Sequence, residues 1–143
     1  MKESKTNPEH NEYYLFGDRP VMFVAVDGES ARQVLKYDWD TGFFVFGSDY
    51  MHKILFGKDE VEELGRAEFI AATEALRRKD FTGENPAFAL YQFVEAIVQK
   101  ARSENRPLTE EETALIRSLN AQTYDMFEDV SILGQNYWKK QAG

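Results

Sequence analysis

The order of the predicted elements, strands first and helices after, predicts an α+β fold in which a small antiparallel sheet packs with helices. Runs of β-branched and aromatic residues fill the first part of the chain, and apolar residues recur at three and four positions after residue 65. At 143 residues, with 43% hydrophobic and 14% aromatic content, the chain has the size and composition of one domain. We expect three to five strands and about three helices in a single domain over residues 12–143, after a flexible polar arm at 1–11.

The first two strands are predicted from short apolar runs. The segment EYYLF, residues 12–16, is predicted to be an edge strand or an anchoring segment. The segment PVMFVAV, residues 20–26, is continuously apolar and ends at the turn pair Asp27-Gly28. A run without polar alternation is typical of a strand buried on both faces, so we place it at the centre of the sheet.

A hairpin is predicted over residues 32–46. The segment ARQVLKYDW alternates between two faces, with Gln33, Leu35, Tyr37 and Trp39 on one of them, and FFVF continues the aromatic pattern at 43–46. Gly42 follows Thr41 and is predicted to adopt a positive φ in the bulged turn.

A short helix and a fifth strand follow the hairpin. Ser48 is predicted to cap a helix over residues 49–56, with Asp49 in its first turn and Gly57 at its end. The segment EVEEL, residues 60–64, is predicted to form one more short strand.

The second half of the chain predicts three helices. An amphipathic helix over 66–78 ends at FTGENP, and Asn85-Pro86 opens a second helix that runs to the Asn105-Arg106-Pro107 turn. Thr109 and Glu112 have the spacing of a capping box at the start of the last helix, whose apolar stripe continues to Val130. We expect the last two helices to pack as an antiparallel hairpin.

The charge balance restricts the classes of partner. Seventeen Lys and Arg against 25 Asp and Glu give a net charge of −8, which disfavours direct binding of nucleic acid and favours a basic protein partner. No apolar run approaches the roughly 18 residues that a membrane span requires. The N-terminal segment lacks the apolar core of a signal peptide and the chain has no cysteine, so we expect a cytoplasmic protein.

No sequence motif predicts a metal, a cofactor or a catalytic group. Asp38 and Asp40 resemble the opening of a calcium loop, but Gly42 and Phe43 occupy the positions where that loop needs an oxygen ligand and a glycine. The acidic cluster of Asp59, Glu60, Glu62 and Glu63 could serve a magnesium-dependent enzyme, although such clusters are more often solvated faces. We therefore expect a protein that is not an enzyme.

Aromatic residues beside carboxylates suggest a protein-binding surface instead. Many of the aromatic residues lie between Tyr13 and Phe56, where they either fill a core on both sheet faces or are partly exposed for binding. The predicted contact residues are Tyr37, Asp38, Trp39, Asp40, Asp59, Glu60, Glu62 and Glu63. The hypothesis is a non-catalytic acidic module of the immunity, antitoxin or inhibitor type, and the alternative is a structural or regulatory subunit, such as a homodimer.

Overall fold

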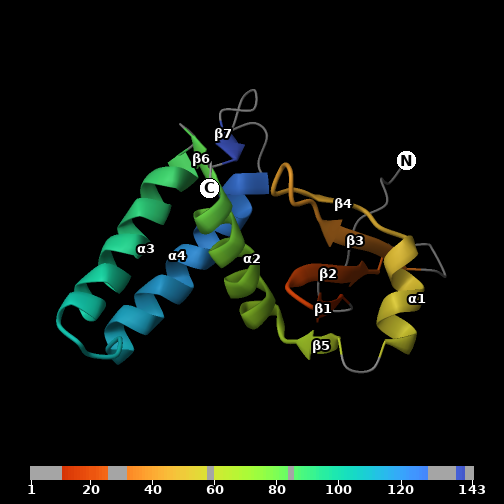
Figure 1. Ribbon diagram of the computed structural model, residues 1–143, viewed down its shortest axis with the longest axis horizontal. Helices are drawn as coiled ribbons and strands as arrows, with labels where there is room; N and C mark the ends of the chain where they lie inside the picture. The colour runs from red at the N-terminus through yellow and green to blue at the C-terminus, as the bar shows by residue number, and fades with distance from the viewer. Residues whose placement is uncertain (1–10, 26–31, 58–59, 84–85, 129–137, 141–143) are drawn as a thin grey trace, which may run out of the picture. The chain divides into compact units, whose positions relative to one another are not determined.

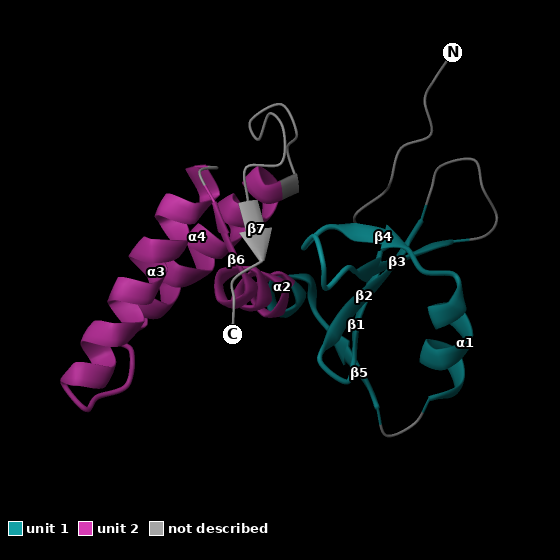
Figure 2. Cartoon of the chain, turned by 45° about the horizontal axis from the view of Figure 1, so that its top comes forward, with its two compact units in different colours: residues 1–69 teal, residues 70–143 magenta. Residues whose placement is uncertain are grey.

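The computed structural model describes residues 11–25, 32–57, 60–83, 86–128 and 138–140. The chain divides into two compact units, residues 1–69 and 70–143 (Figure 2). The predicted flexible arm lies outside the described residues, apart from Asn11. The expectation of a single domain over 12–143 stays a prediction.

Unit 1 contains a five-stranded antiparallel sheet with the strand order β4-β3-β2-β1-β5 (Figure 1). The strands are β1 (Glu12–Phe16), β2 (Arg19–Val24), β3 (Gln33–Tyr37), β4 (Phe44–Phe46) and β5 (Val61–Leu64). With the helices that follow in the chain, this sheet confirms the predicted α+β class.

The central position of β2 is confirmed, but the edge position expected for β1 is wrong. Val21 and Phe23 on one face of β2 and Val24 on the other are all buried. β1 pairs with β2 on one side and with β5 on the other, with Tyr14 opposite both Val21 and Glu63. The edges are therefore β4 and β5. The local sequence of β1 could not reveal this, because β5 comes from a segment nearly 50 residues away.

The predicted hairpin forms between β3 and β4, with the predicted positive φ at Gly42. Tyr37 lies opposite Phe44 and Leu35 opposite Phe46. Gly42 has a φ of 78°, the left-handed conformation that glycine adopts without steric cost. The cross-strand hydrogen bond from Asp38 N–H to the Phe43 carbonyl, at 2.8 Å, closes this turn.

α1 spans Asp49–Phe56 as predicted, but its ends are built differently. Ser48 has helical backbone angles and its side chain makes no capping hydrogen bond, so the predicted cap is wrong. Gly57 is extended, with a φ of −76°, and its N–H donates to the Lys53 carbonyl. A Cβ at Gly57 would lie 2.4 Å from that carbonyl oxygen, so close approach of the backbone requires glycine here.

The two faces of the sheet are buried against different partners. On one face, Val21, Phe23 and Val34 pack with Tyr50 and Ile54 of α1. On the other face, Phe69 contacts Tyr13, with ring centroids 4.8 Å apart, and stacks on Phe44 at 5.5 Å. Aromatic side chains thus fill a core on both sides of the sheet.

α2 (Arg66–Asp80) leads into unit 2, where α3 (Pro86–Ser103) and α4 (Glu110–Glu128) form the predicted antiparallel hairpin (Figures 1 and 2). A two-stranded sheet of β6 (Phe81–Gly83) and β7 (Trp138–Lys140) was not predicted. Each of its strands has only three residues, and their pairing joins segments more than 50 positions apart. Neither strand carries a local pattern long enough to indicate it.

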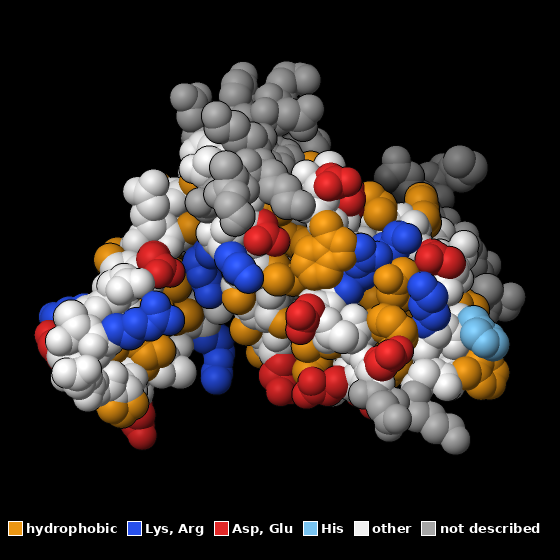
Figure 3. Space-filling model, viewed as in Figure 1, with side chains coloured by type: hydrophobic (Ala, Val, Ile, Leu, Met, Phe, Trp, Pro, Cys, Tyr) orange, Lys and Arg blue, Asp and Glu red, His pale blue; other side chains and the backbone are white. Residues whose placement is uncertain are grey.

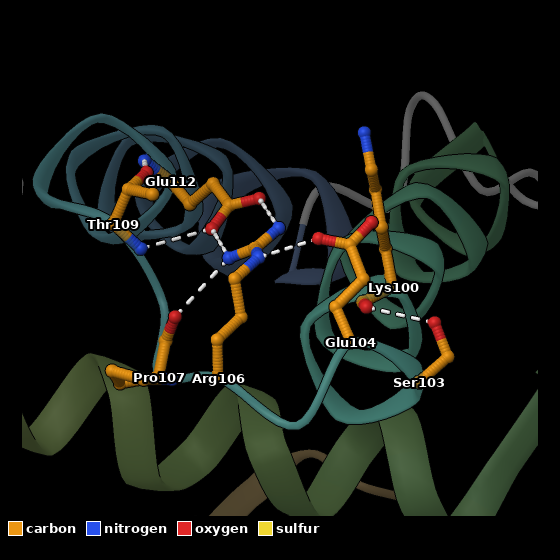
Figure 4. Close-up of polar contacts among 7 residues, drawn as sticks. All are labelled: Lys100, Ser103, Glu104, Arg106, Pro107, Thr109 and Glu112. Carbon is orange, nitrogen blue, oxygen red and sulfur yellow. Dashed lines mark hydrogen bonds and ion pairs between the residues drawn. The ribbon is translucent and has the colours of Figure 1, made fainter.

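The connection between α3 and α4 is fixed by hydrogen bonds (Figure 4). Glu112 N–H donates to Thr109 Oγ1 at 3.0 Å and Thr109 N–H donates to Glu112 Oε1 at 2.9 Å, which confirms the capping box. Arg106 NH1 and NH2 donate to the two oxygens of the same carboxylate at 2.8 and 3.2 Å. The start of α4 is therefore joined to the turn that precedes it.

Candidate functional site

The tip of the β3–β4 hairpin is organised by Asp38. Its carboxylate accepts hydrogen bonds from Asp40 N–H at 3.2 Å and from Thr41 Oγ1 at 2.8 Å. Its carbonyl accepts the N–H groups of Thr41 and Gly42. Since these contacts hold the turn in shape, the structure gives Asp38 a local role in folding, and its predicted role in partner binding stays a prediction.

The aromatic residues of this tip are more covered than the carboxylates. Tyr37 has no exposed surface and meets Trp39 edge to face, with centroids 5.3 Å apart. Trp39 is half-buried, and the Arg19 guanidinium lies 5.3 Å from its ring centroid. Of the four predicted hairpin residues, Asp40 is exposed, Asp38 and Trp39 are half-buried, and Tyr37 is fully buried. The first three have surface that a partner can contact.

Of the second predicted group, Glu62 and Glu63 lie on the edge strand β5 and Glu60 directly precedes it. Glu60, Glu62 and Glu63 are exposed, and within the described part of the chain no basic side chain pairs with them. Asp59 lies outside the described residues. Figure 3 shows acidic side chains gathered beside β5. These carboxylates are solvated and are available to a basic partner.

Exposed apolar side chains adjoin this acidic strand. Leu55 and Phe56, at the end of α1, are 60% and 67% exposed. The end of α1 lies close to the start of β5. A Cβ at Gly57, the residue after α1, would lie 3.0 Å from Val61 Cγ2. Neither Leu55 nor Phe56 was among the predicted contacts. The signal in the sequence was that Leu55 and Phe56 directly follow Ile54, a residue that α1 buries, on a helix of only eight residues.

A cluster of cations surrounds Tyr50 in unit 1. Arg19 NH1 donates to the Tyr50 hydroxyl at 2.9 Å, and Lys53 Nζ and Lys36 Nζ lie 4.4 and 5.2 Å from the Tyr50 ring centroid. Asp49 approaches Lys36 at 3.5 Å. The sequence did not indicate this cluster, because its members come from β2, β3 and α1. Asp49 offsets one of these three charges, and the face of the tyrosine ring attracts the cations that lie over it.

Unit 2 contains a buried polar network that was also missed. Glu74 and Arg77 of α2 have no exposed surface, and Arg77 NH1 lies 2.9 Å from Glu74 Oε2. The Tyr91 hydroxyl of α3 donates to Glu74 Oε1 at 2.8 Å. The Arg77 guanidinium lies 4.1 Å from the ring centroid of Phe127 on α4. The network therefore joins the three long helices.

Burial governs the protonation of this network. Removal from water raises the pKa of Glu74, and the charge of Arg77 with hydrogen bonds from Thr123, Tyr91 and Arg77 partly offsets that rise. Burial also raises the pKa of Tyr91, and the nearby Glu74 carboxylate raises it further. Tyr91 thus stays protonated and serves as a hydrogen-bond donor to Glu74.

A groove opens in unit 2 beside this network, with a volume of about 690 Å³. Its walls come from α2, β6 and α3. The lining residues are Ala75, Arg78, Lys79, Phe81, Thr82, Phe88, Tyr91, Gln92, Glu95, Val98 and Arg102. The groove combines cationic and aromatic side chains, and none of them was predicted as a site residue.

The described residues contain no group of three side chains suited to hold a metal ion. Among the helices that the structure describes, none is long and apolar enough to cross a membrane. Searches with protein-family models, curated proteins and solved structures find no match to this chain. Any functional assignment must therefore come from the surfaces described above.

Proposed function

We propose that the protein is a non-catalytic, cytoplasmic binding module that docks a basic protein through the surface formed by the end of α1 and the edge strand β5. We call this the α1–β5 surface, defined by Leu55, Phe56, Glu60, Glu62 and Glu63. Along the strand Glu63 shares the α1 face with Val61, and Glu62 lies on the opposite face of the same edge. The observation that carries the proposal is the exposure of Leu55 and Phe56 at the end of α1, where Gly57 lies against Val61 of β5, together with exposed carboxylates at β5 that no described basic side chain neutralises.

The chemistry of this surface suits a partner with a basic rim. Large apolar side chains that lose water on contact supply affinity, and rim carboxylates orient a basic partner and speed its approach. β5 is also a sheet edge, so its outer backbone groups can pair with an extended segment of a partner. An acidic module of this kind fits the immunity, antitoxin or inhibitor class.

A second candidate, a subunit of a homo-oligomer, is favoured by the opposite edge of the sheet. Phe46 on β4 is 74% exposed and Val45 is 38% exposed. Pairing of two β4 strands would extend the sheet and place a neighbouring side chain beside each of them, on opposite faces. Light scattering of the purified protein distinguishes the two candidates, because a homodimer has twice the chain mass.

The test is affinity capture from the source organism with the immobilised full chain. We compare the wild type with Leu55→Ser/Phe56→Ser and with Glu60→Lys/Glu62→Lys/Glu63→Lys. The matched control is Leu115→Ser/Asp125→Lys on α4 of unit 2, which changes an exposed apolar and an exposed acidic side chain outside the residues that define this surface.

We expect a basic protein that the wild type and the control capture and that both α1–β5 variants lose. With that partner purified, the apolar variant should weaken binding roughly tenfold or more, as for interface anchors. The charge-reversal variant should chiefly slow association and reduce its salt dependence. Equal affinity of folded variants and wild type would contradict the proposal.

A further inference from the structure

The groove of unit 2 has the dimensions of a small-molecule site. Its volume of about 690 Å³ lies within the roughly 300–1,000 Å³ that is typical of ligand pockets. One wall comes from the last turns of α2, the other from one side of α3, and β6 adds Phe81 and Thr82. The described residues that line the groove all belong to unit 2.

The charge of the groove is opposite to that of the whole chain. Among the described lining residues, Arg78, Lys79 and Arg102 are cationic and Glu95 is the one carboxylate. The chain as a whole has a net charge of −8. Figure 3 shows Lys and Arg side chains gathered over the neighbourhood of α2 and α3. Cations concentrated in a concave surface attract anions, because the low-dielectric walls focus their field.

Buried hydrogen bonds fix two of the lining side chains. Arg78 NH1 donates to Asn120 Oδ1 of α4 at 2.6 Å, and the Tyr91 hydroxyl donates to Glu74 at 2.8 Å. Burial lowers the pKa of Arg78, in keeping with a guanidinium that has lost part of its water. A ligand that enters therefore meets side chains already ordered, which reduces the entropy lost on binding.

Apolar surface lies beside the cations. Phe81, Phe88 and Val98 line the groove with the ring of Tyr91, and Phe88 meets Tyr91 edge to face at 5.3 Å. Phe81, Phe88 and Tyr91 are buried and pack against neighbouring rings, so they offer only a small apolar surface to a ligand, and half-buried Val98 adds to it. A ligand that carries an apolar body in addition to its charge would lie against this surface.

We propose that this groove binds a small organic anion, with its acid group against Lys79, Arg102 and Arg78 and its apolar body against Phe81, Phe88 and Val98. The shared chemistry is a carboxylate or phosphate on an aromatic or aliphatic body. The proposal is independent of the α1–β5 surface, which lies in the other unit, so either one can fail alone.

The experiment is a titration of the isotope-labelled full chain followed by amide chemical shifts in NMR spectra. Phenyl phosphate and phenylacetate are the two anionic probes, and benzyl alcohol is the neutral probe of similar size. We expect saturable shifts at groove residues with at least one anion, and weaker binding of benzyl alcohol. The stronger of the two anions identifies phosphate or carboxylate as the preferred group.

Two exposed lining residues give the test variant, Lys79→Gln/Arg102→Gln. It should weaken binding of the anion roughly tenfold, because two charge-assisted contacts are lost. The control, Lys100→Gln/Arg117→Gln, removes the same charge from exposed positions outside the groove and should leave affinity unchanged. The spectrum of each unliganded variant reports its folding, and Lys79→Gln alone replaces a double variant that unfolds.

The proposal would be overturned by the absence of saturable shifts with both anions, by shifts that lie outside the groove, or by equal binding of benzyl alcohol and the anions. An equal loss of affinity in the control variant would also overturn it, because the effect would then follow from net charge alone.

Discussion

The two units of the molecule have cores of different chemistry. In unit 1, the residues between the sheet and α1 are Val21, Phe23, Val34, Tyr50 and Ile54. In unit 2, apolar side chains surround Glu74, Arg77, Asn120 and Thr123, all of them buried. Within the described residues, every buried polar or charged side chain other than tyrosine lies in unit 2. One chain therefore fills the core of one unit with apolar and aromatic side chains and includes a polar network in the core of the other.

The network of unit 2 is a costly way to fill a core. Moving a carboxylate and a guanidinium out of water costs several kcal/mol per ion, and their attraction returns this only when hydrogen bonds satisfy the remaining atoms. Glu74 meets Arg77 and Tyr91, and the Arg77 guanidinium also lies over the ring of Phe127. Such directional contacts favour one arrangement of α2, α3 and α4, which apolar packing alone specifies less strictly.

The largest expected effect comes from breaking this network on one side. Arg77→Met leaves the Glu74 carboxylate buried without its cation, and we expect a loss of about 3–5 kcal/mol in the free energy of unfolding. Urea denaturation followed by the helical circular-dichroism signal measures it. A loss below about 1 kcal/mol would mean that the ion pair contributes no more than an exposed one.

The double variant Glu74→Met/Arg77→Met is the matched control. It removes both charges and keeps apolar volume in the core, so we expect it to be more stable than Arg77→Met alone. Tyr91 then loses its acceptor, which limits the recovery. A double variant less stable than the single one would show that the charges stabilise the unit beyond their mutual pairing.

The difference between the cores also explains what the sequence could predict. The strands of unit 1 have local signals, such as the unbroken apolar run of β2 and the glycine of the hairpin turn, and both were identified. Glu74 and Arg77 are three residues apart on a helix, a spacing that usually marks an exposed pair. Glu74 and Arg77 follow Ile70 and Thr73 by four residues each and so lie on the same face of α2. This spacing was the signal in the sequence that both side chains are buried.

The candidate sites were less predictable than the fold. Exposure of Glu60, Glu62 and Glu63 followed from their charge. The groove of unit 2 could not be predicted, since Lys79 and Arg102 come from different helices and only tertiary packing brings them to one concavity. The burial of Tyr37 depends likewise on Trp39 and Phe44, whose contacts form only when the hairpin closes.

A smaller effect is expected at the helix caps, where the two units again differ. Thr109 makes the capping box of α4, whereas the Ser48 side chain makes no capping bond to α1. Thr109→Ala should therefore lower the free energy of unfolding by about 1 kcal/mol, and Ser48→Ala should have little effect. Urea denaturation compares them, and equal midpoints for the two variants would contradict this difference.

The smallest expected effect on stability concerns Glu112, an accessible carboxylate whose pKa moves in the opposite direction from that of buried Glu74. Hydrogen bonds from Arg106, and then from Thr109 N–H, lower the pKa of Glu112 to about 2. The unfolded chain therefore binds the proton more readily, so this contact stabilises the fold above about pH 4.5 and its contribution is lost as the pH falls towards 2.

In Arg106→Gln we expect the pKa of Glu112 to rise towards 4.5 but to stay below it, because the Thr109 N–H still donates. Carboxyl NMR titration measures this, with Arg117→Gln as the control, and an unchanged Glu112 midpoint in Arg106→Gln would show that the helix terminus, not the arginine, sets the pKa.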